Sequence, residues 1–354
     1  MMETMEIPVT RVKKSRLAEM DFNHLPFGKY FSDHMLEADY ANGEWVKVAI
    51  KPYQPIQIEP SLMALHYGQA IFEGIKAYRD KEGHAFIFRP YDNLKRFNIS
   101  AERMEMPAVP EDIFIEGMRQ LIALDKEWIP AKDDYSLYIR PFMFSTDAAL
   151  GVRPSDTYKF MILLSPTGPY YAAPMKIYVE EKYTRAAPGG VGFAKNAGNY
   201  GASLKASSEA KEKGYDQVLW TDAFEHKWLQ EVGTMNVFFV LGNTVVTPSL
   251  EEGTILAGVT RDSVITVLRE QGLKVEERRI SIDELIGAHR GGQLTEIFGS
   301  GTAATISYIK ELKYKDYIMH FDTGSFKTAP LAKKILTEIR EGKRADAHSW
   351  LLKV

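Results

Sequence analysis

The sequence predicts a mixed α/β (α+β) protein with two domains. The chain has 354 residues, more than most single domains contain, and its 45% hydrophobic content suffices for two packed cores. Strand-like and helix-like segments both occur and alternate most regularly in the second half. The segment SPTGPYYAAP (165–174) places three prolines and a glycine between two apolar runs. We therefore expect α/β domains at 1–171 and 177–354, joined by a linker at 172–176.

The first domain contains a predicted hairpin followed by a helix. The segments IFEGIKAYRDKEG and HAFIFR (84–89) are apolar strands separated by a turn at 80–83 that contains glycine. The next segment, PYDNLKRFNISAERM, begins with Pro90 and repeats Leu94, Phe97 and Ala101 at helical spacing.

The rest of the first domain is predicted to contain one long helix and two buried strands. PEDIFIEGMRQLIALDKEWIP (110–130) begins with proline and acids, as helices do, and places Ile113, Met118, Leu121 and Ile122 toward one side. SLYIRPFMF and YKFMILLSP are short apolar runs typical of buried strands.

In the second domain, strands and helices alternate. Helices are expected near 200–213, ended by Gly214, and near 260–271 and 282–290. The predicted strands are MKIYVEE, QVLWTD, TMNVFFVLG, KVEERRI and EIFGSG.

Composition excludes several classes of function. The 44 Lys plus Arg and 47 Asp plus Glu give a net charge of −3, so no global charge favours binding to nucleic acid or to an anionic membrane. The absence of cysteine excludes disulfides and thiolate catalysis, and the eight histidines show no HExxH spacing, so no metal is expected. Neither a secretory signal nor an apolar run of about 18 residues is visible, and we expect a cytoplasmic protein.

Lys195 lies within GGVGFAKNAGNYGASLK (189–205), a run of small residues. Gly192, Ala194, Ala197 and Gly198 would let the backbone approach a ligand closely, but they would equally suit a flexible loop. The residues alone leave open whether Lys195 is a reactive amine or a solvated ammonium.

Two glycine-rich segments are candidate helix starts. LAGVTRDSVITVLREQG places Gly258 before an amphipathic segment, and FGSGTAATISYI places Gly299 and Gly301 after a strand. Free N–H groups at such starts bind phosphate, although N-capping and tight turns explain the same pattern. Neither segment is a P-loop or a GxGxxG fingerprint.

Several segments together resemble the branched-chain amino acid aminotransferases. In chain order they are FGKYFSDHML, LHYGQAIFEGIKAYR, FRPYDNLKRF, SLYIRPFMF, KNAGNYGASL, LQEVGTMNVFF, ILAGVTRDS and EIFGSGTAA. The resemblance runs from about residue 25 to about residue 315. It implies a fold type IV enzyme that binds pyridoxal 5′-phosphate (PLP) at the interface of its two domains.

The resemblance also assigns cofactor contacts. It implies that Lys195 is the Schiff-base lysine and proton shuttle, that Tyr200 donates to the cofactor's 3′-oxygen, and that Glu231 pairs with the pyridine nitrogen. From the residues alone, Tyr200 is an aromatic at a helix start that packs on the core, and Glu231 is an exposed acid at a strand edge. The residues implied for the phosphate are Arg96, in preference to Arg89, with Val259, Thr260 and Thr302.

Substrate contacts follow from the same resemblance. An apolar pocket is expected, with the substrate α-carboxylate at the Thr302–Ala303 turn and the Tyr67 hydroxyl, and with Arg140 or tyrosine hydroxyls for the second carboxylate of glutamate. The segment ALGVRP (149–154) resembles a loop that reaches the pocket of a partner subunit, which implies a homodimer. The implied substrate-binding residues are Phe27, Tyr67, Phe72, Tyr138, Arg140, Tyr170, Thr234, Thr302 and Ala303, with Val152 from the partner.

The function implied is reversible transamination of L-leucine, L-isoleucine and L-valine with 2-oxoglutarate, giving branched-chain 2-oxo acids and L-glutamate by a ping-pong mechanism. One alternative within the fold is D-amino acid transamination or aminodeoxychorismate lyase activity. Another is a non-catalytic protein that binds a phosphate-bearing ligand. Some mammalian members have a CxxC pair after the GSGTA turn, where this chain has Ala304 and Ser307, so a thiol switch there is excluded.

Overall fold

The computed structural model describes residues 6–169 and 173–354 and confirms the mixed α/β class. The chain forms two compact units. Unit 1 comprises Met1–Tyr170, Ala194–Ala197 and Ile339–Val354, and unit 2 comprises Tyr171–Phe193 and Gly198–Glu338. Two segments expected in the second domain, residues 194–197 and 339–354, thus belong to unit 1.

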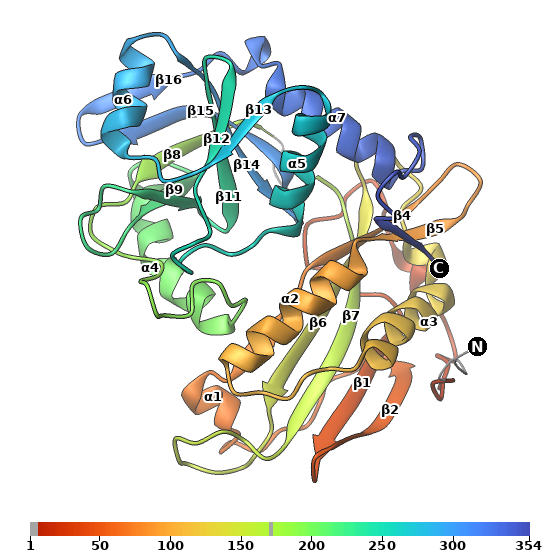
Figure 1. The fold of residues 1–354 in the computed structure, drawn as a ribbon. Helices are drawn as coiled ribbons and strands as arrows, with labels where there is room; N and C mark the ends of the chain where they lie inside the picture. Colours follow the sequence, from red (N-terminus) through yellow and green to blue (C-terminus); the bar gives the residue numbers. More distant parts are fainter. Residues whose placement is uncertain (1–5, 170–172) are drawn as a thin grey trace. The chain divides into compact units, whose positions relative to one another are not determined.

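Unit 1 is built on an eight-stranded sheet with the order β17-β5-β4-β6-β7-β1-β2, in which β3 also pairs with β6 (Figure 1). The predicted hairpin is confirmed: β4 and β5 are antiparallel, and Gly83 has a φ of 85° in the turn between them. The strands are β1 (His34–Ala41), β2 (Glu44–Pro52), β3 (Ala70–Phe72), β4 (Ile75–Arg79), β5 (Ala85–Phe88), β6 (Ser136–Ser145), β7 (Tyr158–Thr167) and β17 (Leu351–Lys353).

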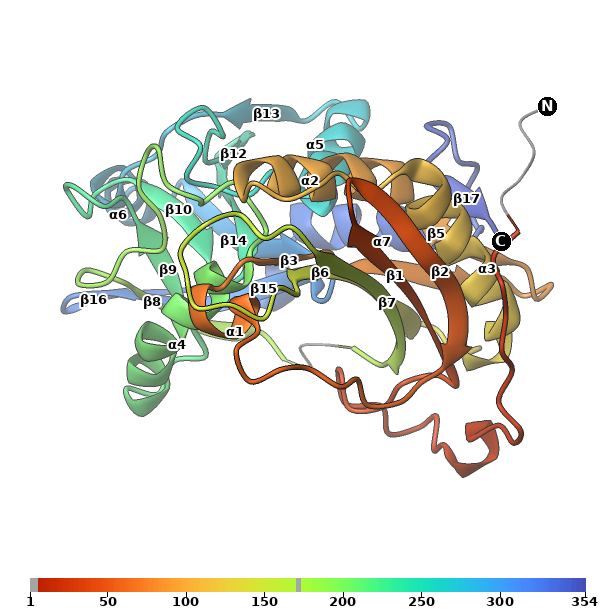
Figure 2. The same cartoon turned by 90° about the horizontal axis from the view of Figure 1, so that it is seen from below.

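Two helices lie along one face of this sheet, α2 (Pro90–Arg103) and α3 (Gly117–Leu124) (Figures 1 and 2). The helix predicted after Pro90 is confirmed, since Leu94, Phe97 and Ala101 are buried in the core of unit 1. The short helix α1 (Met63–Tyr67) precedes β3.

The continuous helix predicted over 110–130 is wrong. A π turn (Asp112–Glu116) precedes α3, and a 3₁₀ turn (Lys126–Trp128) follows it. A Cβ on Gly117 would lie 2.5 Å from Leu36, so the helix approaches β1 closely where the π turn ends. At the other end, the Asp125 carboxylate accepts the His34 N–H at 2.9 Å. Tertiary contacts therefore set both irregularities, which helical periodicity does not reveal.

Strand β6 separates the core of unit 1 from the predicted pocket residues. Leu137 and Ile139 are fully buried in the core that contains α2 and α3. Side chains alternate along a strand, so Tyr138 and Arg140 point to the opposite face of the sheet.

Unit 2 contains a nine-stranded sheet that closes on itself. The strand order is β10-β9-β8-β15-β14-β11-β12-β13, and an additional β10–β11 pairing joins the first six strands into a ring. The strands are β8 (Met175–Val179), β9 (Gln217–Thr221), β10 (Leu229–Val232), β11 (Met235–Leu241), β12 (Thr244–Thr247), β13 (Lys274–Glu277), β14 (Leu294–Gly301), β15 (Thr305–Tyr314) and β16 (Tyr317–His320), which pairs with β15.

The helices predicted in unit 2 are confirmed as α4 (Ala197–Glu212), α5 (Val259–Glu270) and α6 (Ile282–Arg290). Helix α7 (Thr328–Arg340) was not predicted, and its start is fixed by Glu296, whose carboxylate accepts the N–H groups of three successive residues at 2.7–2.9 Å. Across the two described ranges, no helix has the length and apolar character needed to span a membrane.

The helix start expected after Gly299 and Gly301 is wrong. Both glycines lie in β14, and Thr302 begins the turn that leads into β15. A Cβ on Gly299 would lie 2.9 Å from the terminal methyl of Met235 and 3.1 Å from Val232, so a larger residue would have to shift the Met235 side chain.

Candidate active site

The main chain at Lys195 is fixed, which excludes a slack loop. The Lys195 N–H donates to Ser100 Oγ at 2.9 Å, and its carbonyl accepts the Phe72 N–H at 3.1 Å. The next residue, Asn196, forms a β-bridge with Ile71. Lys195 is half-buried, so the interpretation as a fully solvated ammonium is wrong.

Five of the predicted residues form one cluster in unit 1. Lys195 Nζ lies over the Phe72 ring, 4.6 Å from its centroid, and the Arg140 guanidinium lies over the same ring at 4.6 Å. Arg140 Nη2 donates to the Tyr138 hydroxyl at 2.8 Å. Phe27 packs edge-on against Tyr138, with 4.8 Å between centroids. Two cations and three aromatic rings therefore share one surface, here named the aromatic cluster.

Gly74, which the sequence analysis did not single out, makes this arrangement possible. A Cβ on Gly74 would lie 2.3 Å from the Tyr138 hydroxyl oxygen. Any other residue would therefore displace Tyr138 or the strand. The position in FEGIK gave no signal beyond the glycine itself.

Arg96 is buried on α2 and firmly oriented, so it does not lie on a solvated helix face. Its Nε and Nη2 atoms each donate to the Glu73 carboxylate at 2.7 Å, a bidentate geometry that fixes the guanidinium plane. Ser100 Oγ donates to the Arg96 carbonyl at 3.1 Å and accepts the Lys195 N–H. Helix α2 thus joins Arg96 to the backbone of Lys195.

In unit 2, Glu231 is buried in β10, and the expected exposed position is wrong. Its Oε1 accepts the Leu256 N–H at 2.9 Å and Asn236 Nδ2 at 3.3 Å. Its Oε2 lies 2.6 Å from Arg185 Nε. A main-chain donor, an amide and a cation therefore hold this carboxylate in one place, here named the Glu231 network.

Arg185 and Asn236 were missed by the sequence analysis. Asn236 Nδ2 also donates to the Leu256 carbonyl at 2.9 Å, and a Cβ on Gly258 would lie 2.0 Å from its Oδ1. A polar Asn within the apolar strand TMNVFF was a usable signal, since buried amides need partners. Arg185 had no comparable signal, because its partners come from distant parts of the sequence.

Val259 and Thr260 occupy the first turn of α5, next to Gly258, and both are buried. The N–H groups of a first helical turn lack partners within the helix and favour anions. This helix start was predicted correctly and has the donors that a phosphate requires.

The other predicted residues are less closely associated. Tyr200 is half-buried in the first turn of α4. Thr234 is exposed in the β10–β11 turn, and Thr302 and Ala303 are half-buried in the β14–β15 turn. The remaining three are Tyr67, exposed at the end of α1, Val152, exposed on a loop, and Tyr170, which lies outside the described residues.

Packing between chain segments, and not the approach of a ligand, explains one glycine near Lys195. A Cβ on Gly192 would lie 2.5 Å from the Thr254 carbonyl oxygen and 2.6 Å from Ala186. Arg185 Nη1 donates to the carbonyls of both Gly192 and Thr254. Close packing of two chain segments therefore requires Gly192.

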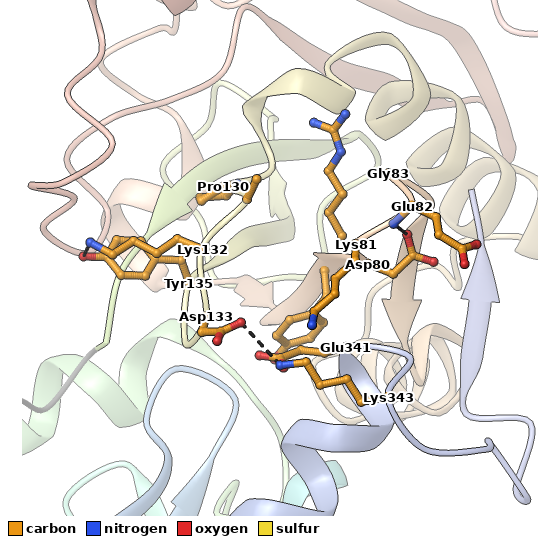
Figure 3. A pocket seen from close by; sticks show the side chains of 13 residues that line it. Asp80, Lys81, Glu82, Gly83, Pro130, Lys132, Asp133, Tyr135, Glu341 and Lys343 are labelled. Atoms are coloured by element: carbon orange, nitrogen blue, oxygen red, sulfur yellow. Dashed lines mark hydrogen bonds and ion pairs between the residues drawn. The ribbon is translucent and has the colours of Figure 1, made fainter.

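Unit 1 also has a polar groove of about 540 Å³ (Figure 3). Its walls come from the β4–β5 turn, the segment 130–135, and Glu341 and Lys343. Asp133 and Lys343 pair across it at 3.3 Å. None of the predicted site residues lines this groove.

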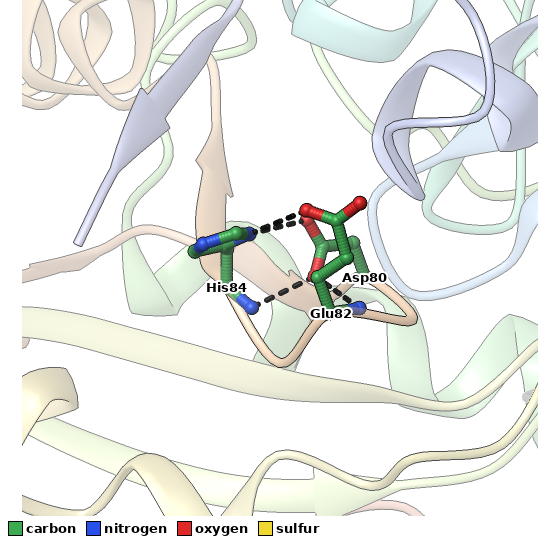
Figure 4. Close-up of side chains that lie close together, drawn as sticks. All are labelled: Asp80, Glu82 and His84. Atoms are coloured by element: carbon green, nitrogen blue, oxygen red, sulfur yellow. Dashed lines mark hydrogen bonds and ion pairs between the residues drawn. The ribbon is translucent and has the colours of Figure 1, made fainter.

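Among the described residues, one group of potential metal ligands lies together: Asp80, Glu82 and His84 (Figure 4). Asp80 Oδ1 accepts the N–H groups of Glu82 and His84, at 3.0 and 2.8 Å, and Asp80 Oδ2 lies 3.0 Å from His84 Nδ1. These bonds stabilise the β4–β5 turn and explain the arrangement.

The residues present fit PLP by the chemistry of their donors. The cofactor needs an amine for its aldehyde, an anion for its ring nitrogen and donors for its phosphate. Unit 1 has a suitable amine in Lys195 and a suitable donor in Arg96, and unit 2 has a suitable anion in the buried Glu231 carboxylate and donors at the start of α5. Each group is held by the contacts described above.

Comparisons with known proteins identify the class. The family model for amino-transferase class IV matches residues 70–312, which places the chain among the class IV aminotransferases. The branched-chain-amino-acid aminotransferase 2 of Bacillus subtilis is 46% identical over 359 residues, spanning 99% of this chain and 97% of that protein.

Solved structures agree. The crystal structure of the Escherichia coli branched-chain amino acid aminotransferase superposes with a TM-score of 0.74 at 27% identity, covering 90% of this chain and 98% of that one. The T.th. branched-chain amino acid aminotransferase in complex with N-(5′-phosphopyridoxyl)-L-glutamate gives a TM-score of 0.72 at 27% identity, covering 89% and 97%. The chain therefore belongs to the branched-chain amino acid aminotransferase family, and it is a transaminase of fold type IV.

Proposed function

We propose that the protein catalyses reversible transamination of L-leucine, L-isoleucine and L-valine with 2-oxoglutarate, using PLP in a ping-pong mechanism. The aromatic cluster is the observation that carries this proposal. Phe27, Phe72 and Tyr138 offer an apolar surface, and Arg140 adds a cation. An apolar side chain can pack on the rings, while the second carboxylate of glutamate can pair with Arg140.

When bound, PLP supplies an electrophilic carbon for amines and a ring that accepts the electron pair left by the departing proton. Lys195 Nζ would hold the cofactor at rest and would take the proton from the substrate α-carbon. The ring of Phe72 under Nζ limits the positions that this amine can take. Tyr200 donates to the cofactor's 3′-oxygen.

The remaining residues bind and orient. Glu231 pairs with the ring nitrogen, because a fixed buried carboxylate favours a proton there. The phosphate is bound by Arg96, Val259, Thr260 and Thr302. The substrate α-carboxylate is bound at the Thr302–Ala303 turn and by the Tyr67 hydroxyl, and Tyr170 and Thr234 line the pocket.

A homodimer and a cytoplasmic location belong to the same proposal. Leu150 and Val152 are 70% and 87% exposed, on a loop that Arg153 pins to Asp147 at 2.8 Å. Exposed apolar side chains on a fixed loop suit contact with a second copy, where Val152 completes the pocket. Light scattering of wild type and Val152→Asp tests this point.

The decisive experiment is a panel of L- and D-amino donors with 2-oxoglutarate, read together with the visible spectrum of the cofactor. Activity on L-leucine, L-isoleucine and L-valine, with a visible band that shifts on adding L-leucine, is the expected result. Use of D-alanine without use of L-leucine would instead favour a D-amino acid aminotransferase. A colourless protein that cannot be reconstituted with PLP would contradict the proposal as a whole.

A further inference from the structure

The C-terminal segment is attached to the start of α2, the helix that carries Arg96. Strand β17 pairs with β5, with Leu351 opposite Phe88. Immediately before it, the Trp350 carbonyl accepts the Arg89 N–H at 2.6 Å. The Trp350 ring packs edge-on against Phe88 at 5.7 Å and lies under the Arg89 guanidinium, 4.9 Å from its centroid. Trp350 therefore contacts both Phe88 and Arg89, the two residues that precede the helix.

Arg89 has a backbone conformation that needs such support. It is the N-cap of α2 and has φ 51° and ψ 46°, a left-handed conformation that residues with a Cβ rarely adopt. Its N–H bond to Trp350 and the stacked indole hold it there, because both would be lost if the residue returned to ordinary φ values.

Hydrogen bonds continue from Arg89 to Arg96. The Arg89 carbonyl accepts Asn93 Nδ2 at 2.8 Å, and Asn93 Oδ1 accepts Arg96 Nη2 at 3.4 Å. Asn93 is only 2% exposed, so water does not compete for these bonds. The backbone of the C-terminal segment is thus linked to the Arg96 guanidinium through the main chain of Arg89 and the side chain of Asn93.

We propose that Trp350 and β17 position Arg96, through Arg89 and Asn93, for binding the cofactor phosphate. The inference rests on the proposed function, in which Arg96 binds that phosphate. Arg89, Asn93 and Trp350 are positioning residues, and the C-terminal segment is a part of the cofactor site that lies far from it in sequence.

The test compares PLP with pyridoxal, which lacks the phosphate. Full-length protein stripped of cofactor is titrated with each ligand, and the ratio of the two dissociation constants is measured for Asn93→Ala, Trp350→Ala and Trp350→Phe. Loss of a hydrogen bond to a charged group corresponds to about tenfold weaker binding. Because the Asn93 bond is long and Glu73 still holds Arg96, we expect Asn93→Ala and Trp350→Ala to weaken PLP by a few-fold, up to about tenfold. Pyridoxal binding should change little, and Trp350→Phe should restore most of the loss.

Asn98→Ala is the matched control. Asn98 lies on the same helix and also makes two hydrogen bonds, to the Val109 N–H and carbonyl, outside the path to Arg96. Its substitution should leave the ratio unchanged. Equal weakening of PLP and pyridoxal in Asn93→Ala would mean a general structural role and would overturn the inference.

Arg96→Ala separates this inference from the proposed function. If Arg96→Ala leaves the ratio unchanged, the phosphate assignment itself is wrong. If Arg96→Ala lowers PLP affinity selectively but Asn93→Ala matches wild type, the positioning path is wrong while the assignment stands. Asn93→Ala keeps β17 intact, so the test does not depend on Trp350→Ala folding.

Discussion

The aromatic cluster of unit 1 and the Glu231 network of unit 2 hold charge in opposite ways. In the cluster, Lys195 and Arg140 rest on the face of Phe72 and stay partly exposed. In the network, Glu231 is 3% exposed and bound by a main-chain N–H, an amide and a guanidinium. The cation–π contacts hold charge on a partly exposed ring, whereas the Glu231 carboxylate is buried and held by several hydrogen bonds and a guanidinium. The cluster is suited to groups that react and recognise, and the network to a fixed anchor.

Lys195→Ala tests the partly exposed side of this comparison and should have the largest effect. Removing the amine that moves the proton should lower kcat by at least about a thousandfold, because general acid–base catalysis contributes up to about four orders of magnitude. Steady-state turnover with L-leucine measures it. Lys205→Ala, an exposed lysine on α4 paired with Glu209 at 3.2 Å, is the control and should keep wild-type turnover. Near-normal turnover of Lys195→Ala would refute its role.

Glu231→Gln tests the role of the buried carboxylate in the Glu231 network. The amide keeps the shape but loses the charge, so the ring nitrogen is no longer held protonated, and kcat should fall by about a hundredfold. It also leaves Arg185 without its ionic partner at 2.6 Å. The half-buried strand acid Glu276, substituted by Gln, serves as control. If both variants lose activity equally, the anchor role of Glu231 fails.

Arg140→Met separates the role of the cation from that of the apolar surface in the aromatic cluster. The apolar surface remains, but the cation for a second carboxylate is lost. The KM for 2-oxoglutarate should rise by roughly tenfold, because one charge-assisted hydrogen bond is removed, while the KM for L-leucine changes little. Both KM values are measured on one preparation, and the KM for L-leucine serves as the control for the KM for 2-oxoglutarate. An equal rise in both would assign Arg140 to the α-carboxylate or to Tyr138 alone.

Lys76 shows a third way of holding charge and should give the smallest effect, on stability. It is buried, and burial together with the nearby charge of Arg340 lowers the pKa of its amine to about 7, against the opposing effect of Asp134. Substituting Met removes the desolvation cost of the buried charged amine, so the free energy of unfolding at pH 7 should rise by roughly 1 to 3 kcal/mol.

The sign of the pH dependence follows from the lowered pKa. Between pH 7 and about 10.4 the unfolded chain binds the Lys76 proton and the folded chain does not, so the wild type gains stability as pH rises. The advantage of Lys76→Met is therefore greatest at pH 7 and below and shrinks toward pH 10. Urea unfolding at several pH values measures it, and an advantage independent of pH would contradict the assignment.

Local sequence patterns predicted helices and strands whose signals lie close together in the sequence. They did not predict helix ends that are set by contacts with distant residues. Helix α2 and the β4–β5 hairpin were predicted because their signals lie within a few residues, as with Pro90 and Gly83. The irregular ends of α3 were missed, because contacts with Leu36 and His34 cause them. The start of α7 was missed for the same reason, since Glu296 lies about thirty residues earlier in the chain.

The same distinction between local signals and distant contacts applies to the residues of the candidate site. Motifs brought Phe27, Phe72, Tyr138, Arg140 and Lys195 onto the list of candidates, and the structure places all five together. Gly74, Arg185 and Asn93 were not found, because each acts on a candidate residue instead of on a ligand. Such supporting residues have no composition of their own and become visible only with coordinates.

The discontinuity of unit 1 has a consequence during synthesis. Its residues 339–354 follow the whole of unit 2 in the chain, and they include β17, which covers the free edge of β5. A ribosome makes about 5 to 20 residues per second, so some 170 residues of delay leave that edge open for roughly ten seconds or more. An open strand edge is a template for pairing with other chains. The edge of β5 in nascent unit 1 is thus open to incorrect pairing until residues 339–354 have been made.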